Sequence, residues 1–326
     1  MTGSAAQAVV HFNRSAFKIR PVTQADRSAV EAIAAGTWEG HDYLPDVFDA
    51  WLEDSAGYFF AGELEGRVVA VARLAHFGGD QWWMEGLRVD PSFRGLGIGR
   101  IMHHYVVRYS RRFAPGIVRF STGSGNAAVV KMAAETGFRQ VARFAAYGAA
   151  ADDQIATGQL VKLGPGDIDR AWSRLVALPH YAAAQRTLED RWRFLPLTPD
   201  LLRDRLAEGQ VWGWMRPDGQ TLAGLVVLDA PRTKEQVDVD GQVTEHRHLV
   251  VGFADALHDE FGAMARSLRG LAASAGMDRV SWKVLDDPAL VMRLEAAGYE
   301  QRWDMKVLLF ERELSLTERA PLEGEN

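Results

Sequence analysis

The chain has 326 residues, of which 47% are hydrophobic and 25% are charged, and its formal net charge at pH 7 is −6. This length favours two domains of ordinary size, and the composition is that of a globular protein. The sequence holds no cysteine, which excludes disulfides, a thiol nucleophile and thiolate metal sites. The acidic balance argues against nucleic acid as a partner.

The N-terminal residues of the chain show no signal-peptide pattern. Residues 1–15 lack the order of a signal peptide, and no apolar run approaches the length of a membrane span. We therefore expect a cytoplasmic protein that does not bind membranes. Residues 1–15 are rich in small residues and are expected to form a flexible tail, and the acidic residues 317–326 a second one.

Strand and helix patterns alternate through the first half of the chain. Residues 17–22 alternate like an opening strand, and Thr23 is a suitable N-cap for the helix that follows. A hairpin is expected across the turn at Glu65-Gly66. The other expected elements are helices near 47–52, 98–112 and 126–136 and strands over 58–62, 67–75, 82–89, 117–122 and 139–147.

The most informative stretch follows the strand over residues 82–89. It reads Val89-Asp90-Pro91-Ser92-Phe93-Arg94-Gly95-Leu96-Gly97-Ile98-Gly99-Arg100, with three glycines at alternate positions before a helix. Because glycine adopts positive φ without a Cβ clash, the backbone amides of such a loop can turn inward together. At the positive N-terminus of a helix, these amides form a site for a phosphate or diphosphate.

A second block lies further along the chain, and it reads Asn126-Ala127-Ala128-Val129, then Met132, then Gly137-Phe138. In this order the two blocks resemble the acyl-CoA-binding signatures of the GNAT superfamily of N-acyltransferases. The resemblance covers about residues 17–147. It implies an α/β fold with a splayed central mixed sheet flanked by helices, and it implies acetyl-CoA as co-substrate with no metal.

The resemblance also implies roles for particular residues. In the superfamily, backbone groups of the strand before the loop bind the acyl carbonyl and the pantetheine arm, and the loop amides bind the diphosphate. Arg94 would lie at the diphosphate, and Asn126 would hold the pantetheine where the sheet opens. The implied cofactor-binding set is Leu87, Val89, Arg94, Gly95, Leu96, Gly97, Ile98, Gly99, Arg100 and Asn126.

Glu85 is the candidate catalytic base. It lies two residues before Leu87, so strand alternation puts the two side chains on one face of the sheet. Many members of the superfamily carry a carboxylate at this position, which relays a proton from the amine; the alternative is a solvated or ion-paired strand glutamate. The adjacent Trp82 and Trp83 are either walls of an acceptor pocket, with a cation–π face for an amine, or core residues.

One position departs from the superfamily pattern. A tyrosine that often acts as general acid on the thiolate is replaced here by Ala133. Because free thiols ionise near pH ~8.5, a missing acid lowers the rate without preventing the reaction. The pair His103-His104 is not expected to bind metal, since adjacent helical residues point apart. His246 and His248 lack a third ligand and are expected at the surface.

The second half repeats the element order of the first. Residues 149–157 are small and polar and are expected to link domains over 16–150 and 151–316. The glycine loop is absent, and the corresponding stretch carries three carboxylates that would repel a diphosphate: Ala254-Asp255-Ala256-Leu257-His258-Asp259-Glu260. We expect a degenerate GNAT-like domain without an acyl-CoA site, which completes the acceptor pocket or an interface.

The sequence therefore predicts a tandem GNAT-like N-acetyltransferase whose N-terminal half moves an acetyl group to a primary amine of a small molecule or peptide. Two alternatives stay open. One is a transferase for a longer acyl chain or another acceptor, as in two-domain mycothiol and aminoglycoside acetyltransferases. The other is a non-catalytic acyl-CoA sensor or interaction module, which the alanine at position 133 favours.

Overall fold

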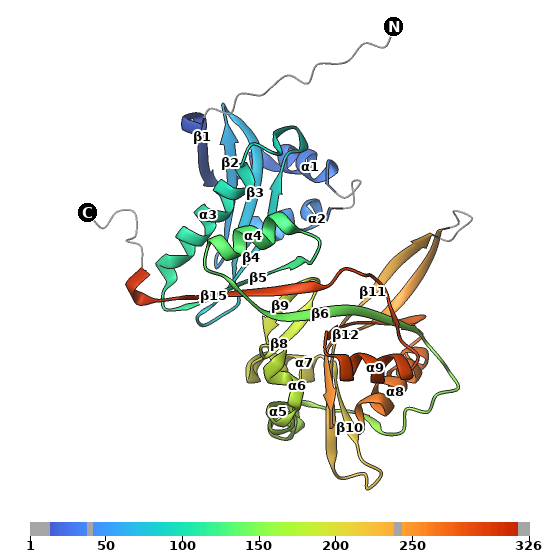
Figure 1. The fold of residues 1–326 in the computed structure, drawn as a ribbon. Helices are drawn as coiled ribbons and strands as arrows, with labels where there is room; N and C mark the ends of the chain where they lie inside the picture. Colours follow the sequence, from blue (N-terminus) through green and yellow to red (C-terminus); the bar gives the residue numbers. More distant parts are fainter. Residues whose placement is uncertain (1–13, 38–41, 238–242, 258, 319–326) are drawn as a thin grey trace. The chain divides into compact units, whose positions relative to one another are not determined.

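The computed structural model describes residues 14–37, 42–237, 243–257 and 259–318, and it divides into two compact units (Figure 1). The first unit comprises the described residues up to Phe120, residues 131–138 and the described residues from Glu311 onward. The second comprises residues 121–130 and the described part of 139–310. Most of the two expected tails, residues 1–13 and 319–326, lies outside the described residues.

The first unit is built on a mixed sheet with the strand order β1-β2-β3-β4-β5-β15. Its pairs are antiparallel from β1 to β4, whereas β4 and β5 are parallel. The strands are β1 (Phe17–Pro21), β2 (Tyr58–Leu64), β3 (Arg67–His76), β4 (Gln81–Val89), β5 (Gly116–Gly123, up to Phe120) and β15 (Val307–Leu314, from Glu311).

Helices cover both faces of this sheet. Figure 1 shows α1 (Arg27–Ala35) and α2 (Leu44–Glu53) on one face and α3 (Ile98–Ser110) on the other. A further helix, α4 (Ala127–Glu135), follows β5. The expected fold class, a mixed sheet flanked by helices, is confirmed.

The helices pack on the sheet through apolar stripes. Val30 and Ile33 of α1 and Phe48 of α2 recur at helical spacing and are buried with Val71 of β3. Burying each such side chain stabilises the fold by about 1.5–3 kcal/mol. This core fixes β3 and β4 beneath the segment that carries the glycine loop.

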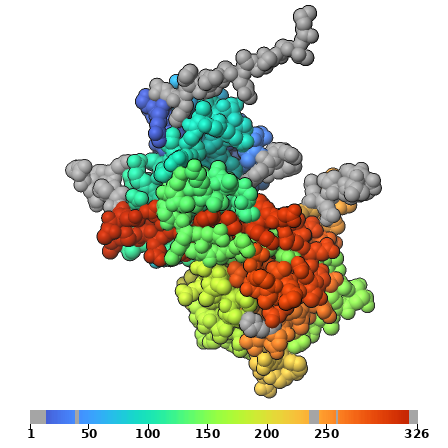
Figure 2. All heavy atoms as spheres, viewed as in Figure 1, coloured from blue at the N-terminus to red at the C-terminus, as the bar shows by residue number. Residues whose placement is uncertain are grey.

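The division into units differs from the expected boundaries at the closing strands. The sequence predicts that the strand after α4 closes the first sheet, but β6 (Arg139–Ala150) pairs with β13 and β14 and belongs to the second unit. The last strand of the chain instead lies next to β5 in the first unit. Figure 2 shows this C-terminal strand in red. Periodicity predicts a strand without specifying its neighbour.

A buried ion pair holds the last strand in place. Arg119 of β5 donates two hydrogen bonds to Glu311 Oε2, at 2.9 and 2.7 Å, and both side chains are nearly buried. Removing one partner leaves an uncompensated buried charge, so we expect Glu311→Ala to lower the free energy of unfolding by roughly 3 kcal/mol in a denaturant titration. Glu31→Ala, which breaks the exposed pair with Arg27, should cost less than about 0.5 kcal/mol. Equal effects of the two changes would contradict the assigned strand neighbour.

The second unit has the strand order β6-β13-β12-β11-β10-β7, with β14 on β6 and a separate β8–β9 hairpin. The pair β12–β13 is parallel, and the pairs β6–β13, β6–β14, β11–β12, β10–β11 and β7–β10 are antiparallel. Its further strands are β7 (Leu160–Lys162), β8 (Thr187–Asp190), β9 (Arg193–Pro196), β10 (Val211–Met215), β11 (Leu222–Val237), β12 (Val243–Ala256), β13 (Arg279–Leu285) and β14 (Glu300–Gln301). Its helices are α5 (Ile168–Ala177), α6 (Pro179–Ala183), α7 (Pro199–Ala207), α8 (Phe261–Ser274) and α9 (Pro288–Ala296).

Two buried histidines have depressed pKa values. His103 of α3 lies with Nε2 2.9 Å from Thr136 Oγ1, and burial lowers its pKa to about 4. His248 of β12 is buried rather than at the surface as the sequence predicts, and burial, assisted by nearby cations, lowers its pKa to about 4. Both therefore stay neutral in the folded protein at pH 6, where a histidine of the unfolded chain begins to take up a proton.

We expect stability to fall as the pH drops from about 6.5 towards 4, because the unfolded chain then binds protons that the folded chain excludes. Each histidine contributes up to about 1.4 kcal/mol per pH unit in that window. Urea titrations at pH 7 and pH 5 measure the decrease in the free energy of unfolding. This decrease should be smaller in the His248→Gln variant. An unchanged free energy of unfolding between these pH values would contradict the prediction.

Candidate functional site

The glycine loop connects β4 to α3 in the first unit. Asp90 begins it by accepting a hydrogen bond from the Ser92 amide at 2.8 Å. Gly95 and Gly97 have φ of 80° and 81°, and Gly97 is the N-cap of α3. The first amides of a helix lack intrahelical partners, and the helix dipole makes this end positive. A Cβ added at Gly95 or Gly97 would meet no atom within 4 Å, so the loop surface is open to an anionic ligand such as a diphosphate.

The remaining loop residues differ in what they contact. Arg94, assigned by sequence to the diphosphate, folds back to Val89 O and to Gly36 O and Thr37 Oγ1, each at 3.3 Å. It therefore braces the loop against the end of α1. Arg100 in the first turn of α3 pairs with Glu135 at 3.0 Å and keeps more than half of its side chain exposed.

The sheet opens immediately before this loop. Strands β4 and β5 pair in parallel from Gln81 with Ile117 to Trp83 with Arg119. Leu87 and Val89 lie beyond this pairing. Here the edge of β4 that pairs with β5 earlier in the strand has no paired residue of β5. Such an open edge presents backbone N–H and C=O groups to an extended ligand, which is the role that sequence reasoning implied for these two residues.

A bulge in β4 separates Glu85 from Leu87. Arg73 of β3 faces Glu85 and Val71 faces Arg88, so β4 has one more residue than β3 in this interval. Gly86 makes the bulge possible, with φ of 66° and the Trp51 ring only 2.6 Å from where a Cβ would lie. Bulges re-aim side chains near active sites, and simple alternation therefore does not describe this part of the strand.

Glu85 is not a solvated strand carboxylate. It forms an ion pair with Arg73, whose other terminal nitrogen binds Asp54 at the end of α2. The Arg73 guanidinium also lies 4.9 Å from the ring of Trp51. Sequence reasoning missed these partners, because Asp54 and Arg73 lie in other elements and match no motif.

A second charged pair lies beside the first. Arg88 Nε donates to Asp42 Oδ2 at 2.6 Å, and the Asp42 side chain is fully buried. The Arg88 guanidinium lies 5.4 Å from the ring of Tyr43. Burial, with smaller contributions from Glu85 and Asp42, raises the pKa of Tyr43 to about 12 although Arg88 opposes the shift. Tyr43 therefore stays uncharged at neutral pH.

The two tryptophans of β4 are core residues. Trp83 is 2% exposed, and Trp82 is 7% exposed and stacks on Phe113 with 4.1 Å between ring centroids. Of the two interpretations left open by the sequence, the structure supports the core. The tryptophan next to the charged cluster is Trp51, which no motif singled out.

The second sequence block is divided between the units. Asn126 lies in the second unit, where its Oδ1 accepts a hydrogen bond from the Val129 amide at 3.3 Å and caps α4. Its pantetheine role remains a prediction. Ala133 lies in the first unit and is fully buried, so no side-chain proton donor is present at that position.

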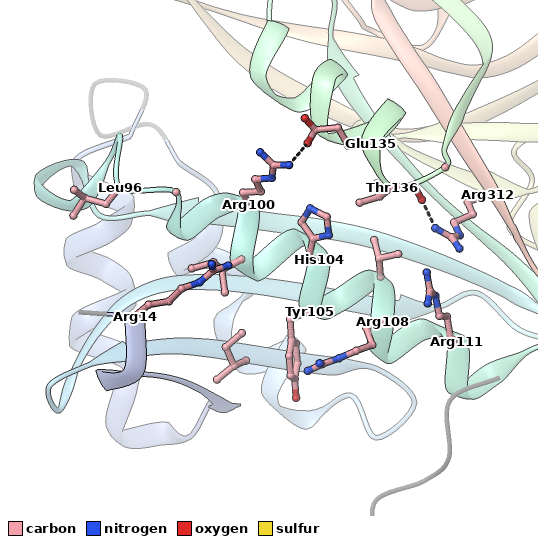
Figure 3. A pocket seen from close by; sticks show the side chains of 15 residues that line it. Arg14, Leu96, Arg100, His104, Tyr105, Arg108, Arg111, Glu135, Thr136 and Arg312 are labelled. Atoms are coloured by element: carbon pink, nitrogen blue, oxygen red, sulfur yellow. Dashed lines mark hydrogen bonds and ion pairs between the residues drawn. The ribbon is translucent and has the colours of Figure 1, made fainter. Parts of the chain in front are cut away.

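A groove of about 1090 Å³ begins at the loop and crosses α3 (Figure 3). Leu96, Gly97 and Arg100 line its start. Figure 3 shows Arg100 turned towards Glu135, and Arg312 bound to Thr136 O. Its lining carries far more positive than negative charge: Arg14, Arg100, Arg108, Arg111 and Arg312 against Glu135. A groove of this charge suits a phosphate-rich ligand.

The residues of the second unit that sequence reasoning places opposite the glycine loop make internal contacts. Asp255 lies within β12, not at a helix N-terminus as the sequence predicts, and it is fully buried against the backbone amide and Nδ1 of His180, at 2.8 and 2.9 Å. Glu260 accepts hydrogen bonds from Trp214 and Arg216, both at 2.7 Å. His258 lies outside the described residues.

Comparison with known proteins identifies the first half. Residues 27–138 match the family model described as acetyltransferase (GNAT) family. A stretch of 96 residues is 30% identical to the human probable N-acetyltransferase 16, over 29% of this chain and 26% of that one. A stretch of 81 residues is 30% identical to a histidine N-acetyltransferase of Oreochromis niloticus, over 24% of each chain. The matched segments thus span about a quarter of these relatives.

The fold agrees with this assignment. A GCN5-related N-acetyltransferase from Sphaerobacter thermophilus superimposes with a TM-score of 0.61 at 14% identity, over 92% of this chain and 96% of that chain. This likeness concerns the fold alone. The glycine loop, the opened sheet and the family match together show that residues 27–138 belong to the GNAT family of acetyltransferases. In the described part of the chain, no helix has the length and apolar character needed to cross a membrane.

Proposed function

We propose that the protein is an N-acetyltransferase that uses acetyl-CoA and acylates a primary amine of a small molecule or peptide in the cytoplasm, with its active site in the first unit. The observation that carries this proposal is the loop at Gly95 and Gly97, whose left-handed backbone places open amides at the N-terminus of α3. The loop lies inside the segment that matches the acetyltransferase family.

The residues present fit coenzyme A. The amides from Gly95 to Arg100 would bind its diphosphate. The backbone of β4 at Leu87 and Val89, beyond the pairing with β5, would bind the acyl carbonyl and the pantetheine arm. The arginine-lined groove beside the loop offers positive charge to the nucleotide end. The thioester of the bound co-substrate supplies an activated acyl group. Residues of the protein bind the two substrates and accept the proton of the amine.

Glu85 is proposed as the group that takes the proton from the amine. An amine enters as an ammonium ion and attacks only after losing a proton. In the reaction the amine nitrogen forms a bond to the acyl carbon, the carbon–sulfur bond breaks, and the thiolate leaves. With Ala133 at the usual position of the acid, no side chain there protonates the thiolate.

The second unit is proposed to be a degenerate GNAT-like domain without acyl-CoA. Apart from the β8–β9 hairpin between α6 and α7, its element order of strand, helices, hairpin, strand, helix, strand and helix follows that of the first half. The internal contacts of Asp255 and Glu260 replace the amides that a diphosphate would need.

The test is release of free thiol from acetyl-CoA in the presence of a panel of amines that includes free amino acids, polyamines and peptide N-termini. Amino acids belong in the panel because a histidine N-acetyltransferase is among the relatives. Amine-dependent thiol release with a matching acetylated product supports the proposal. Coenzyme A binding without turnover on any amine favours the acyl-CoA sensor, and no binding of coenzyme A contradicts both.

A further inference from the structure

We infer that Asp54 and Arg73 are positioning residues, which hold the Glu85 carboxylate in one orientation and set the pH range in which it is ionised. The inference deepens the proposed function, on which it rests for the role of Glu85. It concerns residues of α2, β3 and β4 within the first unit alone.

The geometry makes Arg73 the centre of the arrangement. Its Nη1 donates to Glu85 Oε1 and its Nη2 to Asp54 Oδ2, so each carboxylate uses a different arm of one guanidinium. Arg73 is 5% exposed, and the ring of Trp51 lies against its guanidinium. A planar fork fixed by two acceptors and an aromatic ring has little freedom to rotate. Glu85 is therefore bound to a rigid partner.

The charges of the cluster do not cancel. Two carboxylates share one guanidinium, which leaves one negative charge among Asp54, Arg73 and Glu85. Among the described residues near Glu85 are Arg88 and Asp42, which neutralise each other across 2.6 Å, and Tyr43, whose raised pKa keeps it uncharged. When Glu85 takes a proton from an incoming ammonium ion, the charges of Asp54, Arg73 and Glu85 sum to zero.

The two positioning residues act on Glu85 with opposite signs. A neighbouring cation favours the ionised carboxylate, and a neighbouring anion disfavours it. Removing the charge of Arg73 therefore makes Glu85 hold its proton to higher pH, and removing the charge of Asp54 makes it release the proton at lower pH. A loss of packing alone would not move the ionisation of Glu85 in opposite directions in the two variants.

The experiment compares Arg73→Gln, Arg73→Lys and Asp54→Asn with the unchanged protein. We expect the acidic limb of the pH profile of kcat/KM to move up by about 1 pH unit or more in Arg73→Gln and down by a smaller amount in Asp54→Asn. Arg73→Lys keeps the cation and should restore the position of the limb, while its lost fork geometry lowers kcat. The control is Asp49→Asn in α2, which removes an exposed carboxylate that pairs with Arg27 and should leave the limb in place.

A second readout does not depend on turnover. Carbon-13 NMR of glutamate carboxyls, with the Glu85 signal assigned by its loss in Glu85→Gln, follows the ionisation of Glu85 directly. Midpoints that move in opposite directions in Arg73→Gln and Asp54→Asn support the inference, even if no amine is turned over and the proposed function fails. Midpoints that stay within the error of the Asp49→Asn control overturn it, even if acetyl transfer is found. If Arg73→Gln does not fold, the test uses Asp54→Asn alone, because the Asp54 side chain is partly exposed. A Glu85 midpoint that moves to lower pH in this variant supports the inference, and an unchanged midpoint overturns it.

Discussion

Gly97→Val is expected to weaken the binding of coenzyme A strongly. Gly97 has φ of 81° at the N-cap of α3, a conformation that costs a residue with a Cβ about 1–2 kcal/mol. Valine either strains the loop or drives it to negative φ, and in the second case the amides turn away from the ligand. Isothermal calorimetry should show an affinity loss of at least roughly tenfold, the equivalent of 1.4 kcal/mol.

The chain offers a closely matched control in Gly66. This glycine lies in the turn between β2 and β3 with φ of 82°, and a Cβ there would likewise meet no atom within 4 Å. Gly66→Val should therefore lose a similar amount of stability while it binds coenzyme A normally. If both variants bind equally well, or both lose binding equally, the diphosphate site is not at Gly97.

Glu85→Gln is expected to lower kcat by about 10²–10⁴-fold, the usual contribution of a general base. Glutamine has nearly the same shape and still accepts a hydrogen bond from Arg73, but it takes no proton from the amine. The affinity for coenzyme A should stay unchanged, because Glu85 lies on β4 before the loop and not at the amides. Steady-state thiol release and calorimetry on the same preparation measure the two quantities.

Glu63→Gln is a suitable comparison for Glu85→Gln. Glu63 is also a strand glutamate in an arginine ion pair, with Arg20 at 2.7 Å, but it belongs to β2. The Glu63→Gln variant should keep full acetyltransferase activity. Turnover by Glu85→Gln at the unchanged rate would assign the base to another group and leave Glu85 a structural partner of Arg73.

Local signals were sufficient to predict the loop and its helix. Gly95 and Gly97 require a left-handed backbone, and the strand before them and the amphipathic helix after them are coded by neighbouring residues. The surroundings of Glu85 could not be predicted in this way. Its contact with Arg73 depends on the pairing of β3 with β4 and on a bulge at Gly86, and a single sequence gives no pattern that specifies either.

In the second half too, the sequence predicts elements with a clear periodic pattern and does not predict those without one. The sequence predicts its strands and most of its helices, but α6 and the β8–β9 hairpin carry no periodic signal and were missed. The strands β11 and β12 are longer than the apolar runs that predict them. Their outer residues are polar, which is typical of loops, so the sequence underestimates their length. The burial of His248 likewise follows from the strands packed around it rather than from its neighbours in the chain.

The place of the last strand bears on how the protein is made. Arg119 and Glu311 are 192 residues apart in the chain, yet they pair inside the same unit. During synthesis on the ribosome, the N-terminal region emerges long before the segment that completes its sheet. The edge of β5 must wait until the strand that carries Glu311 has been synthesised, so the sheet of this unit is completed late although its first strands are made early.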